Sequence, residues 1–425
     1  MRTLLSLSVA ILAGLLMTRV AKPLKLPSVT AYLVAGVLIG PYCLGLLGIE
    51  GLGFPTQEDV DSLSLISEVA LGFIAFSIGS EFRVSELKHT GKQAFVIGVL
   101  QALAATFLID IALVAIALVT NGKLTIAQAI TLGAIGTATA PAATLMVVRQ
   151  YKAKGPLVDL LLPIVALDDA VGLVLFAVSF GIAKALSSGV VDLYTIVANP
   201  IIEITASLLL GAVAGWVMTQ IEKLFNSNTN RLAITISFVF LTVALSMISV
   251  KIGPVTLGFS SLLVCMMIGA IYCNFFKESD VIMEQCDRWT TPLFILFFII
   301  SGASLDIFNI IHVGVIGIVY VLVRALGKYT GAMWGAAVVK APPTVTKYLG
   351  FTLLPQAGVA IGMAAICART LPAELASAIT TVVLCATLIY ELVGPIVTKL
   401  ALSAAEEIEK KPKKQKPAGN TPANQ

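Results

Sequence analysis

Two neighbouring aspartates, Asp168 and Asp169, lie in the middle of an apolar stretch that runs from residue 157 to residue 186. A helix rises 1.5 Å per residue, so Asp168 would lie roughly 16 Å into the stretch, near the midplane of a ~30 Å hydrocarbon core. One carboxylate at that depth costs about 2.5–3.5 kcal/mol, and two adjacent carboxylates also repel each other. Because a structural role rarely demands this cost, the pair predicts a site that binds and releases a cation and a proton.

The composition places this pair in a membrane protein. Of the 425 residues, 58% are hydrophobic and only 12% are charged, whereas a soluble domain has roughly 25% charged residues. We therefore predict an all-α polytopic membrane protein with about 13 transmembrane helices. The apolar segments of spanning length lie near residues 4–20, 28–48, 62–79, 94–119, 125–147, 157–186, 198–220, 231–250, 255–274, 289–305, 311–339, 347–368 and 375–401.

The basic residues indicate an orientation. When successive loops are assigned to alternating sides, most of the 28 lysines and arginines fall on one side together with the chain's end. Basic residues favour the cytoplasmic side, so we expect an external N-terminus and a cytoplasmic C-terminus in the cell membrane of a bacterium. Residues 403–425 are charged and contain proline, which predicts a disordered cytoplasmic tail. Its lysines could face anionic lipid headgroups, although a solvated tail explains them more simply.

Two of the apolar segments are interrupted by glycine and proline. The segment 125–147 carries Pro141 after Thr137 and Thr139, and the segment 347–368 carries Pro355 beside Gln356. If six helices, one linker helix and six helices follow each other, both segments take the fifth place of their half and run antiparallel. Such a matched pair indicates inverted repeats around a transport site, because broken backbone at membrane depth is tolerated only beside a polar cavity. Glycine and proline are also common in ordinary membrane helices, which is the structural alternative.

Two cations lie at mid-span in the segment 311–339. Arg324 and Lys328 are four residues apart, so they share one helix face, and we expect an ion pair with the aspartate helix. Lysine is the better switch, since it loses its proton readily when buried whereas arginine stays charged. A purely structural salt bridge is the alternative, and the sequence leaves open which of the two cations meets Asp168.

At these residues the chain resembles the monovalent cation–proton antiporters, and specifically the sodium/proton type of their second large branch. The resemblance covers nearly all of residues 4–402 and depends on PSVTAYLVAGVLIGP, GTATAPAATLMVVRQYKAKGPL, ALDDAVG, RALGKYTGA and LLPQAGVAIG. It implies the sodium/proton antiporter fold, a homodimer and an elevator-like movement. The implied division is scaffold or dimerisation helices in 1–93, core helices in 94–186, a linker and scaffold helices in 187–308, core helices in 309–402, and the tail.

The resemblance also implies roles for individual residues. Asp169 would be the main carrier of Na⁺ and protons, with Asp168 beside it at the metal-binding position. Lys328, in the sequence GKYTG, would pair with Asp168, and Arg324 is kept as an alternative partner. An aspartate rather than an asparagine at position 168 resembles the electrogenic members.

The expected ion ligands near the two interruptions include Thr137, Thr139 and Gln356. Some relatives carry an aspartate directly after the threonine of the fifth helix, but here Ala140 follows Thr139, so one ligand of those relatives is missing. Potassium-efflux relatives carry a Gln-Asp pair in place of Asp168 and Asp169, which this sequence lacks.

We therefore expect a secondary active antiporter that exports Na⁺, and Li⁺ as a second candidate, in exchange for H⁺. No cofactor, nucleic-acid partner or enzymatic activity is expected. An electroneutral or potassium-preferring antiporter is the main alternative, followed by a passive cation channel and a sensor without flux. The sequence leaves the stoichiometry, the pH regulation and the physiological role open.

Overall fold

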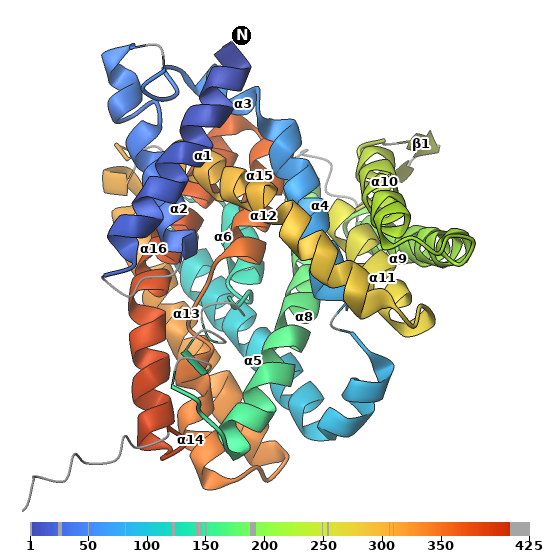
Figure 1. The fold of residues 1–425 in the computed structure, drawn as a ribbon. Helices are drawn as coiled ribbons and strands as arrows, with labels where there is room; N and C mark the ends of the chain where they lie inside the picture. The colour runs from blue at the N-terminus through green and yellow to red at the C-terminus, as the bar shows by residue number, and fades with distance from the viewer. Residues whose placement is uncertain are drawn as a thin grey trace, which may run out of the picture.

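The computed structural model describes residues 2–408 except 24–27, 50, 81, 121–123, 141–143, 145, 146, 149, 150, 188–192, 249, 253, 254, 306 and 309. The described elements form a helical bundle (Figure 1). In chain order they are α1 (Arg2–Ala21), α2 (Ser28–Ile39), η1 (Leu44–Leu47), α3 (Gln57–Asp61), α4 (Ser64–Ser80), α5 (Val84–Val119), α6 (Ile126–Ile135), α8 (Pro156–Ser187), α9 (Leu193–Glu222), α10 (Asn228–Ser246), β1 (Val250–Ile252), β2 (Val255–Leu257), α11 (Ser261–Phe275), α12 (Ser279–Ala303), α13 (Ile310–Val338), α14 (Pro343–Thr352), α15 (Gly358–Thr370) and α16 (Ala373–Ala404).

The predicted all-α architecture is confirmed, with one small exception. Among the described residues, seven helices are long and apolar enough to cross a membrane, and several shorter apolar helices lie between them. The count of about thirteen crossings remains a prediction. The exception is the antiparallel hairpin of β1 and β2, in which Val250 pairs with Leu257.

This hairpin corrects two predicted helix boundaries. The segment predicted over 231–250 ends as a helix at Ser246, and the helix predicted over 255–274 begins only at Ser261. The residues between them are rich in valine and isoleucine, whose branched side chains favour extended backbone. The β-strand propensity of these residues therefore decides the local structure, where the apolar composition alone suggested a continuing helix.

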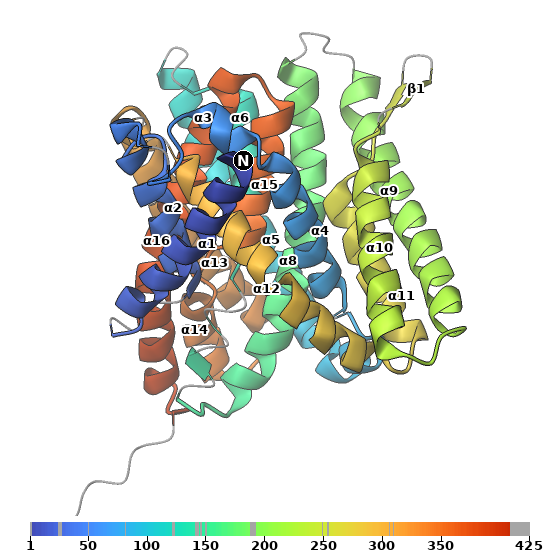
Figure 2. The ribbon, with the colours of Figure 1, turned by 45° about the horizontal axis from the view of Figure 1, so that its top comes forward.

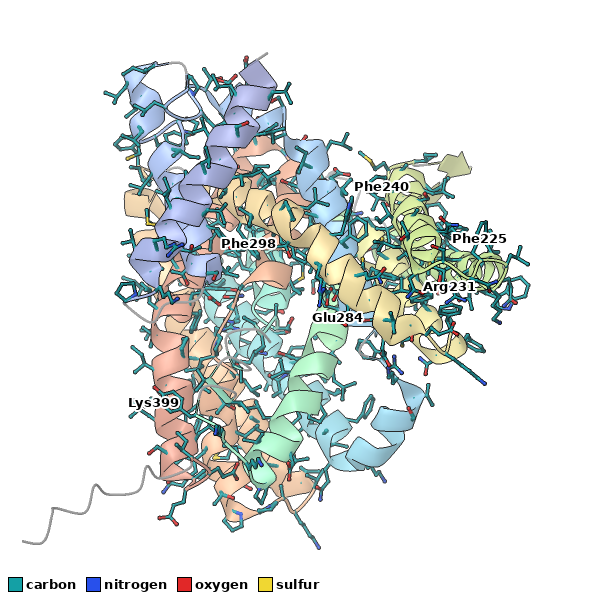
Figure 3. The ribbon with its side chains drawn as sticks, in the orientation of Figure 1. Phe225, Arg231, Phe240, Glu284, Phe298 and Lys399 are labelled. Carbon is teal, nitrogen blue, oxygen red and sulfur yellow. The ribbon has the colours of Figure 1, made fainter. Side chains whose placement is uncertain are left out.

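Large apolar side chains cover the outside of the bundle, as expected in a lipid environment. On α5, Phe107 is 60% exposed and Ile111 is 66% exposed, and on α9 Leu209 is 62% exposed. Phe225 and Phe240, labelled in Figure 3, are two further exposed aromatic side chains in the region of α9 and α10. In water such a surface would be unfavourable, whereas in hydrocarbon it is the ordinary exterior of a helical protein.

Figure 2 shows one group of helices set apart from the rest of the bundle. Helices α9, α10 and α11 lie together on one side, next to α4. Helices α5, α6, α8, α13, α14 and α16 lie together on the other. Helix α1 begins at the top of Figure 1 and α16 ends at the bottom, so these two helix ends lie on opposite faces of the molecule.

Helices α5 and α13 approach each other closely because one helix presents glycines. A β-carbon at Gly327 would lie 2.7 Å from the Cα of Ala105, and one at Gly331 would lie 2.7 Å from the Cα of Gln101. Gly335, one further turn along, faces Ile97 in the same way. A glycine every four residues lets two helix backbones touch, which is how membrane helices gain packing without a hydrophobic driving force. Lys328 lies within this close contact, so the packing fixes its height in the bundle.

Gly331→Ala should therefore destabilise the protein, although alanine is the better helix former by about 1 kcal/mol. The added methyl group must push α5 and α13 apart, whereas Gly317 on the same helix has open space around it. We expect a lower thermal midpoint in detergent for Gly331→Ala and an unchanged or higher midpoint for Gly317→Ala. Equal midpoints for the two variants would show that the contact between α5 and α13 does not limit stability.

The end of the chain closes the start of α8. The carboxylate of Glu407 accepts hydrogen bonds from the backbone N–H groups of Leu157, at 2.7 Å, and Val158, at 3.0 Å. The backbone N–H of Lys154 donates to the carbonyl of Glu407 at 2.9 Å. An acidic group at a helix N-terminus satisfies free N–H groups and complements the helix dipole. Residues 403–408, the first part of the tail predicted over 403–425, thus belong to the fold, with 403 and 404 at the end of α16, while residues 409–425 lie outside the described residues.

Candidate ion-binding site

Two helix ends and the backbone that follows them meet in the middle of the bundle. Helix α6 ends at Ile135, α14 ends at Thr352, and non-helical backbone follows each of them. The N–H of Ala140 donates to the carbonyl of Pro355 at 2.8 Å, and the hydroxyl of Thr144 donates to the carbonyl of Thr352 at 3.2 Å. Backbone from far-apart parts of the chain is thus joined directly, and we call this region the crossing.

Arg324 satisfies carbonyl groups on both sides of the crossing. Its guanidinium donates to Gly136 at 2.8 Å and to Ala138 at 2.6 Å on the first segment, and to Leu354 at 2.8 Å on the second. Its charge lies 4.4 Å from the ring centre of Tyr390, a cation–π distance. The side chain is fully buried. Five N–H donors in a rigid plane suit this role, because helix breaks leave carbonyls without a partner.

Lys328, one turn further along α13, meets Asp168. The ammonium lies 2.7 Å from the Oδ2 of Asp168 and 3.0 Å from the hydroxyl of Thr139, and it also donates to the carbonyl of Thr137. Both members of the ion pair are fully buried. The carboxylate of Asp168 additionally accepts hydrogen bonds from Thr139 and from Gln101. Every partner of this buried anion is a donor, so its charge is well compensated.

The other predicted residues fall in different places. Asp169 follows in α8, but its side chain lies outside the part of the chain that the structure describes, and Pro141 lies outside it entirely. Thr137 uses its hydroxyl within its own segment, donating to Ala134 at 2.7 Å, so only its carbonyl faces Lys328. Gln356 is turned toward the first segment, where its amide donates to the carbonyl of Ile135 at 3.1 Å.

Sequence reasoning missed three residues at this site. Gln101 in α5 holds Asp168, Tyr320 in α13 lies 3.0 Å from the amide of Gln356, and Tyr390 in α16 lies under Arg324. The available signal was a single amide or phenol in an otherwise apolar span, since a buried polar side chain in lipid needs a partner. That signal gives the depth of a residue but not the direction in which it points.

The family model described as "Sodium/hydrogen exchanger, transmembrane" matches residues 7–400, nearly the whole chain. The chain belongs to this family. Its fold and family are those of transporters rather than enzymes. Among curated proteins, it is 22% identical over 364 residues to Cation/H(+) antiporter 18 of Arabidopsis thaliana, which covers 82% of this chain and 43% of that protein.

A shorter match links the chain to Cation/H(+) antiporter 20 of the same plant, at 35% identity over 79 residues, 18% of this chain and 9% of that protein. The chain therefore spans less than half the length of the curated relatives it matches. Among solved structures, the sodium proton antiporter MjNhaP1 from Methanocaldococcus jannaschii at pH 8 aligns with a TM-score of 0.74 at 18% identity, covering 96% of this chain and 99% of that one. A second structure of MjNhaP1 aligns with a TM-score of 0.66 at 17% identity, covering 95% and 98%. At these identities, the two structural matches show the fold of this chain.

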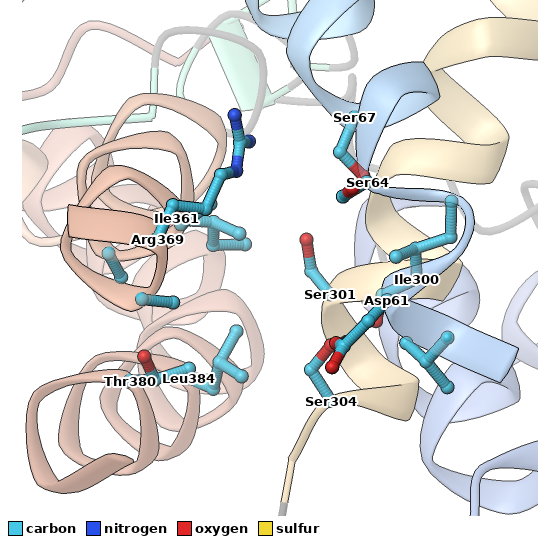
Figure 4. Close-up of a pocket in the computed structure, with 14 residues that line it drawn as sticks. Asp61, Ser64, Ser67, Ile300, Ser301, Ser304, Ile361, Arg369, Thr380 and Leu384 are labelled. Atoms are coloured by element: carbon cyan, nitrogen blue, oxygen red, sulfur yellow. The ribbon is translucent and has the colours of Figure 1, made fainter. Parts of the chain in front are cut away.

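A second polar feature of this exchanger-family fold lies away from the crossing. A cavity of about 280 Å³ lies between α4 and α12 on one wall and α15 and α16 on the other. Figure 4 shows the residues that line it. Arg369 of α15 lines this cavity and forms an ion pair with Glu68 of α4, so a charged contact joins the two walls. We call it the Arg369 pocket. Ser67 and Thr380 stand on opposite walls, and their buried hydroxyls have no hydrogen-bond partner among the described residues.

The buried ion pair allows a stability test. Lys328→Met should cost about 3–5 kcal/mol, because it leaves the Asp168 carboxylate buried beside no cation. Adding Asp168→Asn should recover most of that loss, since the neutral amide still bonds to Gln101 and Thr139. The measurement is the thermal midpoint of the single and double variants in detergent. A double variant no more stable than Lys328→Met would mean that the lysine acts through packing alone.

Proposed function

We propose that the protein is a secondary active antiporter that exports Na⁺ in exchange for H⁺. The single observation that carries this proposal is the fully buried ion pair of Asp168 and Lys328 at the crossing, one residue before Asp169. A fixed membrane protein gains little from such a pair, because desolvating two charges costs about as much as their attraction returns. A carrier, in contrast, gains a carboxylate, that of Asp168, to which a small cation can bind in place of Lys328.

Competition for one site is enough to couple the two ions. Na⁺ prefers hard oxygen ligands, and we propose that Asp169 and Asp168 supply them together with Thr139 and carbonyls near Thr137 and Gln356. Protons compete for the same carboxylates. If the carrier changes sides only when it is loaded, an inward proton gradient drives the cation outward.

Lys328 makes the proposed exchange electrogenic. In the structure its ammonium holds the Oδ2 of Asp168 at 2.7 Å, the place that an arriving cation would take. Once Asp168 turns to the cation, a buried ammonium without its anion is unfavourable, so the lysine releases its proton. With a second proton released from Asp169, one net charge crosses in each cycle. The membrane potential contributes roughly 2.3 kcal/mol per 100 mV for that charge.

The proposed movement assigns the helices to two bodies. Helices of residues 94–186 and 309–402 would form a moving core around the crossing, and those of 1–93 and 187–308 would form the scaffold and a homodimer contact. The ion pair between Glu68 and Arg369 would then join scaffold to core. We further propose that the N-terminus faces outward and the C-terminus the cytoplasm in a bacterial cell membrane.

Asp169→Asn should abolish the exchange, because an amide cannot bind a proton and holds Na⁺ poorly. In everted vesicles that carry a proton gradient, Na⁺ should no longer release the gradient. Asp159→Asn is the matched control, since Asp159 is exposed near the start of the same helix. Full activity of Asp169→Asn would refute the proposed carrier, and the same assay with Li⁺ and K⁺ gives the cation preference.

Replacing the ion pair should change the charge moved rather than stop transport. Proteoliposomes with the unchanged protein should develop a membrane potential when a Na⁺ gradient is imposed. The double variant Asp168→Asn with Lys328→Met should exchange Na⁺ for one proton on Asp169 and develop none. A potential of the original size in the double variant would exclude Lys328 as the second proton carrier, and transport without a potential in the unchanged protein would favour the electroneutral alternative.

A further inference from the structure

Helix α16 carries a row of buried oxygen atoms that the exchange described above does not use. The hydroxyls of Thr380, Thr387 and Thr398 and the Oε1 of Glu391 are buried, and none has a hydrogen-bond partner among the described residues. These positions follow each other at intervals of seven, four and seven residues. At 100° per residue they lie within about 40° of one another around the helix. The four oxygens therefore form a single row along one face of α16.

This row differs from most other buried hydroxyls in the part of the chain that the structure describes, Ser67 excepted. A threonine in a membrane helix usually donates to the carbonyl one turn earlier, as Thr131 does to Ala127 at 2.7 Å and Thr219 does to Gly215 at 2.8 Å. An unpaired buried hydroxyl costs about 1–3 kcal/mol. Several such groups in a line indicate a path along which water or a proton can form hydrogen bonds. A contact that only packs two helices together would not need them.

Glu391, the charged member of the row, lies beside the crossing. Its Oε2 is 3.4 Å from the hydroxyl of Thr30 in α2, and its side chain is 1% exposed. Gly394, one turn later, packs so closely on the crossing that a β-carbon there would lie 2.8 Å from the Cγ of Pro355. Val29, the neighbour of Thr30, packs against Ala140 and Ala357 of the crossing. The carboxyl group is thus placed between α2 and the crossing.

The backbone adds another oxygen at the same height. Pro395 lies inside α16 and has no N–H, so it cannot donate to the carbonyl of Glu391 four residues earlier. Glu391 therefore presents a carboxyl oxygen without a partner among the described residues and a main-chain carbonyl oxygen without its donor four residues later. Proline within a membrane helix is tolerated where waters or neighbouring groups satisfy the freed carbonyl.

No cation of the described structure neutralises Glu391. On α13, Arg324 donates to carbonyls of the crossing and Lys328 pairs with Asp168; on α15, Arg369 pairs with Glu68. On α14, Lys347 lies over the ring of Tyr348, and the described parts of α2 and α6 carry no charged side chain. A lone ionised carboxylate in such a place is prohibitively costly, so the group must hold a proton or a bound cation.

We propose that the row on α16 is a proton path and that Glu391 is its proton-binding group. The row begins at Thr380, which lines the Arg369 pocket, and it passes the crossing at Glu391 before it reaches Thr398. Water held by the hydroxyls would deliver a hydronium proton to the carboxylate of Glu391, forming one O–H bond. The same bond breaks when the proton passes on to water at the crossing and from there to the carboxylates of Asp168 and Asp169, which leaves the Glu391 carboxylate as it began. The inference rests on the proposed function and deepens it, because it names the route by which protons reach the exchange site at Asp168 and Asp169.

A carbodiimide tests the proton directly and needs no substituted protein. N,N′-dicyclohexylcarbodiimide reacts with protonated carboxyl groups in apolar surroundings, so it should add one label to the α16 peptide of the purified, full-length protein. Labelling should fall at alkaline pH and vanish in Glu391→Gln. Glu222 is the internal control, because it is equally buried but its two oxygens accept from Thr235 at 2.8 Å and Tyr272 at 2.7 Å. An unlabelled Glu391 at acidic pH would overturn the proposal.

Transport then tests whether the proton moves. In proteoliposomes, Glu391→Gln should slow Na⁺-driven proton flux by at least about ten-fold, as expected when a proton-transfer group is lost. Its Na⁺-dependent thermal stabilisation should remain, since the cation ligands are intact. Glu222→Gln is the matched control and should retain the original flux. Thr387→Val should slow proton flux, whereas Thr131→Val, which removes a hydroxyl bonded within its own helix, should not.

The outcomes separate this inference from the proposed function. If the unchanged protein exchanges Na⁺ for protons and Glu391→Gln does so at the same rate and with the same pH profile, the proton path is wrong and the antiporter stands. If the unchanged protein shows no exchange, the proposed function fails, while labelling of Glu391 still reports its proton. Labelling that Na⁺ prevents in the Asp169→Asn variant would instead make Glu391 a cation ligand and overturn the assignment as a proton path.

Discussion

The architecture depends on satisfying broken backbone inside a hydrocarbon layer. Every N–H and C=O at membrane depth needs a partner, and a helix that stops in the middle of the bundle leaves several without one. At the crossing, Arg324 supplies three donors to carbonyls of both segments, and the N–H of Ala140 bonds across to Pro355. Because the guanidinium keeps its charge, this brace is permanent. The polar site can exist only because the brace removes the cost of the breaks.

The two cations of α13 have different roles, which follow from the chemistry of their side chains. Arg324 is a planar fork and binds fixed carbonyls, whereas Lys328 is a point charge on a flexible stem and meets a carboxylate that can change partners. They are one helical turn apart, so the packing that positions one also positions the other. The glycines at 327 and 331 allow α5 to approach, and α5 contributes Gln101 to the same carboxylate. Packing and electrostatics are therefore joined at a single helix contact.

Buried polar groups of this protein fall into two kinds. Glu222 in the group of α9, α10 and α11 has both oxygens bonded, which is what a structural carboxyl group in a membrane requires. The row on α16 has four oxygens without partners in the described structure, and it runs from the Arg369 pocket past the crossing. An unsatisfied polar atom is costly in a fixed interior but useful where water or a proton must pass. This contrast distinguishes a path from a packing contact in one molecule.

The sequence by itself determined the membrane setting, the all-helical class, the depth of Asp168 and Lys328 as a candidate ion-pair partner. These follow from residue types alone, because apolar run length and the cost of a buried charge can both be derived from them. It could not place the hairpin around Val250, where β-branched residues overrode an apolar run, nor the docking of Glu407 on α8. Only the tertiary structure decided that Lys328 meets Asp168 while Arg324 braces the crossing, and that Gln101 completes the carboxylate's shell. Sequence spacing gives the face of a single helix. The partner of that face depends on how α5, α8, α13 and α16 pack, and that packing is set by contacts between residues far apart in the chain.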